Sequence, residues 1–323
     1  MRNFHFTDGS VLPKLRIHFT TLGHARKDAS GVVRNAVLIL HGTTGNGRGF
    51  LTPTFAGELF GPGQLLDSTT YFIILPDGIG TGKSSKPSDG LRARFPHYGY
   101  SDMVTAQYRL VTEELGVNHL VLVLGTSMGG MQSWMWAERY PDFMDGVVPL
   151  ASVPTQIAGR NRMMRRFVSQ SIRSDQEWQG GNYSTQPHGL FGALEMLFMM
   201  TSSPRYLHRI APTRDSADEY IDSWIRSRLS TDANDFMYQF EASSDYDPSR
   251  DLEKIRTAVL AINSADDLVN PPELGLMEPL IKRVPRSRYV LLPITDETRG
   301  HGTHSLPRIW KSYLAEFLQS IAH

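Results

Sequence analysis

The stretch that decides the fold is residues 119–129, which read His-Leu-Val-Leu-Val-Leu-Gly-Thr-Ser-Met-Gly. Its first six residues form a short, largely apolar run of the kind that becomes a buried strand, and the last five spell G-x-S-x-G. The residues that follow show a helical pattern as far as Tyr140, and Pro141 stops it. A serine between two glycines, where a strand turns sharply into a helix, has an exposed hydroxyl and is typical of a nucleophile elbow. We therefore predict that Ser127 is a nucleophile.

Apolar runs of strand length recur on both sides of this motif. They cover residues 36–40, 71–75, 146–150, 258–262 and 289–292. A second helical pattern, at residues 101–115, lies between two of the runs. Strands that alternate with helices indicate a parallel sheet covered on both faces. The predicted fold class is therefore α/β, with a mostly parallel central sheet flanked by helices.

Residues 154–247 interrupt this alternation. They are rich in Arg, Met, Ser and Trp and contain no apolar run typical of a buried strand. We predict that they form a helical lid inserted after the sixth strand, over the carboxyl ends of the strands, where open α/β sheets bind ligands. The core then consists of residues 1–153 and 248–323, and the lid of residues 154–247.

Composition excludes several classes of function. The 323 residues include 33 basic and 33 acidic side chains, so the formal net charge of zero argues against broad electrostatic binding to nucleic acid or an anionic membrane. No stretch approaches the roughly 18 apolar residues of a membrane span. The chain has no cysteine, which excludes disulfides, thiolate catalysis and cysteine-ligated metals. We expect a cytoplasmic protein as the sequence stands, or a periplasmic or secreted one if a signal peptide has been removed.

A serine nucleophile needs a base, and the base needs a carboxylate to orient it. In this setting they follow the serine in the order Asp or Glu, then His, each after a strand. His301, which follows the last apolar run and stands behind a glycine, is the predicted base. Two acids follow the run at 258–262: reading 263–266 as the post-strand turn favours Asp266, and counting back from Pro271 favours Asp267. We predict Asp266 and retain Asp267 as the alternative.

Acyl chemistry also needs donors for an oxyanion. His41, Gly42 and Thr43 follow an apolar run, so the backbone N–H groups of Thr43 and Met128 are the predicted pair, with His41 in a structural role. We expect no cofactor and no metal. The loop ending in Gly82-Lys83-Ser84 lacks the first glycine of a phosphate-binding loop, Gly78-Ile79-Gly80 lacks the third glycine of a dinucleotide fingerprint, and the pair His301 and His304 has no further ligands beside it.

The elbow extends to Gln132 as G-T-S-M-G-G-M-Q. It resembles the G-G-S-M-G-G-M-Q of the homoserine O-acetyltransferase-like branch of the α/β-hydrolase superfamily. Further similar stretches are residues 19–23, 35–38, 156–158, 175–183, 232–236, 245–247 and 300–301. The resemblance implies the α/β-hydrolase fold, a Ser-Asp-His triad and, because lid helices of this branch often build dimers, a homodimer.

Two departures from that branch concern the substrate. Gly302 stands where the acetyltransferases usually carry an Asp after the histidine, and that Asp is expected to help hold the amino group of homoserine. The sequences of the loops at 41–43 and 76–84 resemble those of general hydrolases more than those of the acetyltransferases. We therefore expect a serine hydrolase that acts on a small-molecule ester or thioester through an acyl-serine intermediate. The alternatives are an acetyl-CoA-dependent O-acyltransferase of the homoserine type and a catalytically silent binding protein.

The predicted lid also contains a basic cluster made of Arg160, Arg162, Arg165 and Arg166. Such a cluster can meet an anionic acyl donor or a carboxylate substrate. A solvated basic helix face is the interpretation that we favour.

Overall fold

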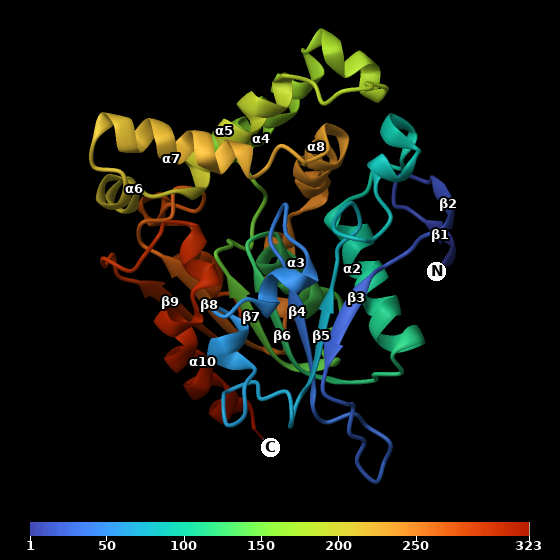
Figure 1. Cartoon of the computed structure of the whole chain (residues 1–323). Helices are drawn as coiled ribbons and strands as arrows, with labels where there is room; N and C mark the ends of the chain where they lie inside the picture. The colour runs from blue at the N-terminus through green and yellow to red at the C-terminus, as the bar shows by residue number, and fades with distance from the viewer. Residues whose placement is uncertain (323) are drawn as a thin grey trace.

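A seven-stranded sheet forms the centre of the computed structural model, which describes residues 1–322 (Figure 1). Its strand order is β3-β5-β4-β6-β7-β8-β9; β3 pairs antiparallel with β5, and every other neighbouring pair is parallel. The strands are β3 Phe19–Leu22, β4 Ala36–Leu40, β5 Phe72–Pro76, β6 Leu120–Thr126, β7 Met144–Leu150, β8 Ala258–Ser264 and β9 Ser287–Leu292. The predicted fold class, a mostly parallel sheet flanked by helices, is confirmed.

A separate two-stranded antiparallel hairpin precedes this sheet. It consists of β1 (Arg2–His5) and β2 (Val11–Lys14) and was not predicted from the sequence. Its strands carry few apolar residues and are largely exposed, so they lack the apolar run by which the buried strands were found.

The two faces of the sheet bury two separate apolar clusters, and β4 contributes to both. Ala36, Leu38 and Leu40 belong to one cluster, whereas Val37 and Ile39 belong to the other, because successive side chains of a strand point to opposite faces. Helices α2 (Tyr100–Arg109), α3 (Met128–Arg139) and α9 (Met277–Ile281) contribute to the first cluster. Helices α1 (Ala56–Leu59) and α10 (Pro307–Ile321) contribute to the second. A strand covered on both faces needs a continuous apolar sequence, which is why these strands could be recognised.

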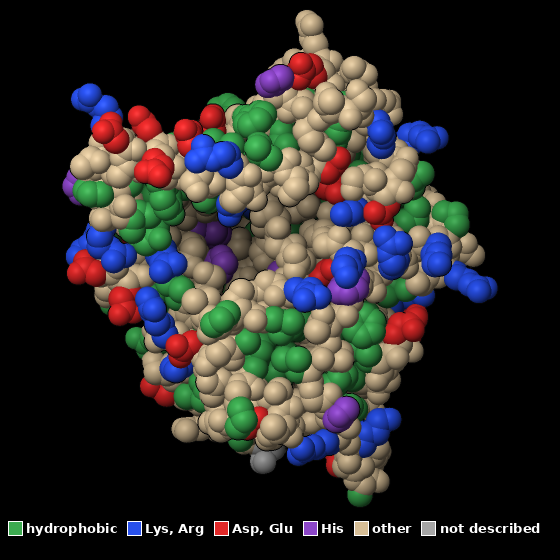
Figure 2. All heavy atoms as spheres, in the orientation of Figure 1, with side chains coloured by type: hydrophobic (Ala, Val, Ile, Leu, Met, Phe, Trp, Pro, Cys, Tyr) green, Lys and Arg blue, Asp and Glu red, His purple; other side chains and the backbone are tan. Residues whose placement is uncertain are grey.

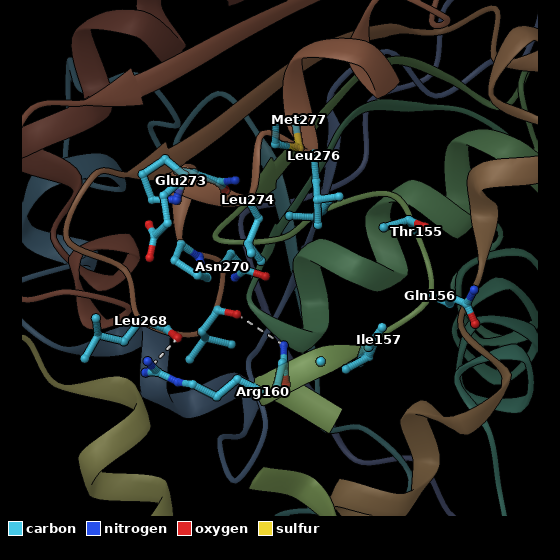
Figure 3. A pocket seen from close by; sticks show the side chains of 18 of the residues that line it. Thr155, Gln156, Ile157, Arg160, Leu268, Asn270, Glu273, Leu274, Leu276 and Met277 are labelled. Atoms are coloured by element: carbon cyan, nitrogen blue, oxygen red, sulfur yellow. Dashed lines mark hydrogen bonds between the residues drawn. The ribbon is translucent and has the colours of Figure 1, made fainter. Parts of the chain in front are cut away.

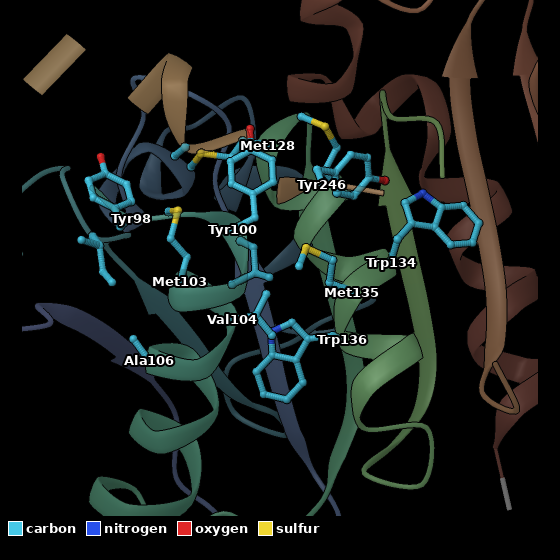
Figure 4. Packing of buried hydrophobic residues seen from close by; sticks show 14 of the residues in the cluster. Tyr98, Tyr100, Met103, Val104, Ala106, Met128, Trp134, Met135, Trp136 and Tyr246 are labelled. Atoms are coloured by element: carbon cyan, nitrogen blue, oxygen red, sulfur yellow. The ribbon is translucent and has the colours of Figure 1, made fainter. Parts of the chain in front are cut away.

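The first cluster is rich in aromatic and Met side chains between α2 and α3 (Figure 4). Trp134 and Trp136 are completely buried there, and the Trp136 indole N–H donates to the Gln107 side-chain oxygen at 2.9 Å. Every residue of α3 from Met128 to Ala137 is buried. The helix that follows Ser127 is therefore held rigidly against the sheet, which fixes the position of the serine.

Residues 154–247, which we call the insertion, contain five α-helices, two short 3-10 helices (Gln176–Gly181 and Ala242–Asp245) and no strand. The α-helices are α4 Gly159–Arg173, α5 Gly189–Thr201, α6 Pro204–Ile210, α7 Arg214–Arg226 and α8 Ala233–Glu241. The helices lie above the sheet in Figure 1. The insertion joins β7 to β8, so it follows the seventh strand in chain order and not the sixth. Two of these first seven strands belong to the unpredicted hairpin. Within residues 1–322, no helix is long and apolar enough to cross a membrane.

Candidate active site

Ser127 occupies the junction between β6 and α3 in a strained backbone conformation, with φ 53° and ψ −111°. Positive φ is uncommon for a residue with a side chain, and strain of this kind concentrates at functional sites. The two glycines of the motif allow the turn. A Cβ on Gly125 would lie 2.0 Å from the Gly129 carbonyl oxygen, and a Cβ on Gly129 would lie 2.0 Å from that of Leu40. The elbow therefore requires glycine at both positions.

A continuous chain of hydrogen bonds joins the serine, a histidine and a carboxylate. The Ser127 hydroxyl lies 2.7 Å from Nε2 of His301, and Nδ1 of the same ring lies 2.8 Å from Oδ2 of Asp267. His301 and Asp267 are buried, with 5% and 1% of their surface exposed. With Nδ1 protonated and donating to Asp267, Nε2 is left to accept the serine proton.

The carboxylate in this chain is Asp267, so the predicted pairing of Asp266 with His301 is wrong. Asp266 instead accepts hydrogen bonds from the Gly300 N–H at 2.9 Å and the Ser264 hydroxyl at 2.6 Å. Consecutive side chains in a tight turn point in different directions, and the sequence does not say which of them faces the histidine. Asp266 thus holds the backbone just before His301, while Asp267 reaches the ring.

Several donors keep Asp267 ionised. Burial alone would raise its pKa, but the His301 imidazole and hydrogen bonds from Val269 and Asn270 outweigh the burial and hold the pKa below its ordinary value. The Val269 N–H donates to Oδ1 at 2.7 Å, and the Asn270 side chain donates to Oδ2 at 3.2 Å. A buried carboxylate with this set of donors can stabilise a cationic imidazole beside it.

The loop after β4 passes directly beside the serine. A Cβ built on Gly42 would lie 3.3 Å from the Ser127 Cβ. Thr44 has a positive φ of 67°, and its N–H donates to the Gln239 side chain of α8 at 2.8 Å, so the insertion helps to hold the loop. The N–H groups of Thr43 and Met128 make no hydrogen bond within residues 1–322. Their role as oxyanion donors remains a prediction.

His41 braces this loop. Its Nδ1 lies 2.8 Å from the Gly42 carbonyl oxygen, and its Nε2 accepts from the Gly78 N–H at 2.9 Å. Burial lowers the pKa of His41, so the ring is neutral and ties two loops together. This agrees with the structural role expected for it.

A second histidine, His304, lies beside the hydrogen-bonded chain; from the sequence it had been weighed only as a metal ligand. The rings of His304 and His301 meet edge to face, with centroids 5.3 Å apart. Burial and the neighbouring His301 lower the pKa of His304 to about 3. Within residues 1–322, no group of three or more potential ligand side chains could hold a metal ion. The only sequence signal for His304 was its spacing of three from His301.

The serine opens into a pocket of 320 Å³ between the core and the insertion. Ser127, Thr43 and His301 line it from the core. Residues of the insertion that line it are Met164, Arg165, Leu197, Thr201, Trp224, Arg228 and Phe240. Figure 2 shows a hollow with histidine side chains inside it. The insertion thus supplies much of the wall around the serine.

A second pocket, of 240 Å³, lies between the start of α4 and the loop 268–278 (Figure 3). Ser127 and His301 do not line it, although Val269 is shared with the serine pocket. The Arg160 side chain crosses its edge and donates to the Leu268 carbonyl at 3.2 Å. This hydrogen bond ties the insertion to the loop that carries Asp267.

Comparisons with known proteins show the family and the fold of this chain. A family model described as the alpha/beta hydrolase fold matches residues 35–295. The chain is 30% identical over 301 residues to a homoserine O-acetyltransferase of Haemophilus influenzae, covering 84% of this chain and 82% of that protein. A homoserine O-acetyltransferase structure from Bacillus anthracis matches with a TM-score of 0.84 at 23% identity, covering 98% of this chain and 95% of the other. The structure of the acetyl esterase MekB matches with a TM-score of 0.82, also at 23% identity, and covers 98% and 95%. The chain therefore belongs to the α/β-hydrolase superfamily, in its homoserine O-acetyltransferase-like branch.

Proposed function

We propose that this protein is a serine-nucleophile hydrolase that cleaves an ester or thioester of a small molecule through an acyl-serine intermediate. The hydrogen-bonded chain from Ser127 through His301 to Asp267 carries the proposal. A serine at its ordinary pKa is a poor nucleophile, and an adjacent oriented base is what activates it. This chain provides that base at hydrogen-bond distance, beside a pocket large enough for a small ester.

In the first half of the reaction, the Ser127 oxygen attacks the carbonyl carbon while Nε2 of His301 takes its proton. Asp267 stabilises the resulting imidazolium, and the amides of Thr43 and Met128 donate to the oxyanion. The tetrahedral intermediate then collapses, and the leaving alcohol or thiol takes the proton from His301. An acyl group remains on Ser127.

In the second half, water attacks the acyl carbon and gives its proton to Nε2 of His301. The carboxylic acid departs as the Ser127 oxygen recovers that proton. Water as the acceptor is supported by Gly302, which lines the pocket where the resembled acetyltransferases usually carry an Asp. Without that carboxylate, the pocket lacks the group expected to hold the amino group of homoserine.

A second candidate is transfer of the acyl group to an alcohol. The similarity to homoserine O-acetyltransferases favours it, and both reactions share the acyl-serine intermediate. They differ only in what attacks that intermediate. The structural likeness to an acetyl esterase shows that the same fold is found in proteins named for either reaction.

Partitioning of the acyl-enzyme distinguishes the two. The enzyme is given 4-nitrophenyl acetate or acetyl-CoA with increasing homoserine or 1-butanol, and free acetate and acetylated acceptor are both quantified. Hydrolysis predicts that acetate release equals leaving-group release at every acceptor concentration. An acetylated acceptor that grows at the expense of acetate would replace the hydrolase with the transferase.

A fluorophosphonate probe provides a separate check on the nucleophile. The wild-type protein should be labelled at Ser127, and a Ser127→Ala variant should not. A wild-type protein that neither labels nor releases acetate would support the third alternative, a silent binding protein.

A further inference from the structure

One arginine of the basic cluster is buried in the wall of the serine pocket. Arg165 is only 4% exposed, whereas Arg160, Arg162 and Arg166 are exposed. The solvated basic face expected from the sequence therefore describes three of the four side chains. Arg165 lies on the buried side of α4, one residue after Met164, which lines the same pocket.

The partners of Arg165 are all neutral. Its Nε donates to the Asn161 side chain at 3.0 Å, and its Nη1 donates to the Ser243 hydroxyl at 3.2 Å. The Phe240 carbonyl lies 3.5 Å from Nη1, and the guanidinium carbon lies 5.6 Å from the centre of the Phe240 ring. The buried Tyr100 phenol is a further neutral neighbour of Arg165. Within residues 1–322, Arg165 forms no ion pair with a carboxylate.

Burying a guanidinium in this way is unfavourable, because arginine remains charged and a buried charge needs a counter-ion. The hydrogen bonds to Asn161, Ser243 and Phe240 orient the group without neutralising it. A charged group that is held in place in the wall of a pocket and has no counter-ion is suited to bind an anion that enters the pocket.

A second arginine, Arg228, lines the same pocket and, among residues 1–322, also lacks a carboxylate partner. The half-buried guanidinium of Arg228 stacks on the Trp224 ring, 3.8 Å from its centre. Its Nη1 donates to the Ser227 hydroxyl at 2.8 Å and the Trp224 carbonyl at 3.2 Å. Within the part of the chain that the structure describes, Arg228 forms no ion pair with a carboxylate.

None of the side chains that line this pocket is acidic. The two guanidiniums are therefore uncompensated, and the pocket favours a negative charge. An ammonium group in it would lie near two cations with no carboxylate to pair with. A site for an amino-acid substrate must accept an ammonium group as well as a carboxylate. This pocket has cationic groups for the carboxylate only, so it favours an anion without an ammonium group.

From this arrangement we infer the substrate class: Arg165 and Arg228 bind a carboxylate of an ester substrate that carries no ammonium group. The inference rests on the proposed function for its ester, and it adds the charge that the substrate must carry. The carboxylate can belong to the acyl part, as in a half-ester of a dicarboxylic acid, or to the alcohol part, as in an acylated hydroxy acid.

Two sets of substrates matched in size test the inference. On the alcohol side, 4-acetoxybutanoate is compared with neutral butyl acetate and with zwitterionic O-acetylhomoserine, which differs from it by the ammonium group. On the acyl side, 4-nitrophenyl hydrogen succinate is compared with 4-nitrophenyl butyrate. In at least one set, we expect kcat/KM of the carboxylate substrate to exceed that of the neutral ester about tenfold or more. On the alcohol side it should also exceed that of O-acetylhomoserine. The set that shows the preference identifies the part of the ester that carries the charge.

Variants connect this preference to the two arginines. Arg165→Met and Arg228→Met should bring the carboxylate-to-neutral ratio close to one, and Arg165→Lys should retain part of it. Arg166→Met, on the exposed side of the same helix, removes an equal charge and should leave the ratio unchanged. Because the ratio compares two substrates on one preparation, loss of folded protein does not alter it, and a purely structural role of Arg165 would not change it.

Binding of 4-acetoxybutanoate to the Ser127→Ala protein, measured by calorimetry, separates this inference from the proposed function. Binding that is lost in the additional Arg165→Met or Arg228→Met variant supports the carboxylate site even if no ester is hydrolysed. Wild-type ratios near one in both sets, or ratios that all arginine variants leave unchanged, would overturn the inference while leaving the acyl-serine chemistry intact. If no ester is turned over, absence of this binding overturns it.

Discussion

Replacing Asp267 with asparagine is the sharpest test of the hydrogen-bonded chain. Oδ1 of Asp267 accepts the Val269 N–H at 2.7 Å, and Oδ2 lies 2.8 Å from Nδ1 of His301. In Asp267→Asn, the Val269 N–H needs an acceptor, so the amide oxygen takes the place of Oδ1. The NH₂ group then takes the place of Oδ2 and faces His301. Because an NH₂ group only donates, it requires Nδ1 to accept.

The proton of His301 must then reside on Nε2, where it prevents that nitrogen from accepting the serine proton. The equivalent change in a Ser-His-Asp enzyme lowers kcat by roughly 10⁴-fold. Each tenfold is about 1.4 kcal/mol of transition-state stabilisation, so the expected loss is about 5 kcal/mol. The loss concerns the barrier more than the fold, because the shapes of the two side chains are nearly the same.

The assay is kcat/KM for 4-nitrophenyl acetate at neutral pH, together with the rate of fluorophosphonate labelling. Asp266→Asn is the matched control, one residue away and with the same loss of charge. In the wild-type protein the Gly300 N–H donates to Asp266 at 2.9 Å, and the amide oxygen of the variant can still accept that hydrogen bond. The control should lose less than about tenfold, since one hydrogen bond is worth roughly 1 kcal/mol. A larger loss in Asp266→Asn than in Asp267→Asn would refute the assignment of Asp267 and restore the prediction made from sequence.

Three further predictions follow from the same geometry. Ser127→Ala should lower kcat by roughly 10⁶-fold while leaving the urea midpoint nearly unchanged; appreciable turnover in this variant would rule out the acyl-serine. Gly129→Ala should destabilise the fold by on the order of 4 kcal/mol, because the added Cβ would meet the Leu40 carbonyl. The control Gly57→Ala, in α1, has no neighbour among the described residues within 4 Å of its added Cβ and should not destabilise the fold. Equal urea midpoints for the two variants would contradict the packing argument. The folded-state pKa of His304, about 3, lies below its ordinary 6.5, so the unfolded chain takes up a proton first and stability is lost as pH falls from about 6.5 toward 3. When the pH is lowered from 7 to 5, the free energy of unfolding in urea should therefore fall by roughly 2 kcal/mol less for His304→Leu than for the wild type. An equal fall in both proteins would contradict the burial of a neutral ring.

Ser127 and His301, which the structure joins by a hydrogen bond, were both singled out from the sequence alone, because each stands in a recognisable local pattern. A glycine-flanked serine between an apolar run and a helix can be recognised within eleven residues. A histidine behind a glycine after the last apolar run needs only the order of the strands. The central sheet was predictable for the same reason: strands buried on both faces are apolar throughout.

Tertiary structure decided which acid faces His301 and which arginine lines the pocket. Asp266 and Asp267 are adjacent and chemically identical, and only the course of the turn directs one to Gly300 and the other to His301. Arg165 and Arg166 are likewise adjacent, and the packing of α4 against α5 and α8 buries one and exposes the other. Local patterns determine which element forms, because they depend on neighbours in the chain. The direction of a side chain depends on segments far away in sequence, and for this protein those directions decide both the hydrogen-bonded chain and the charge of the pocket.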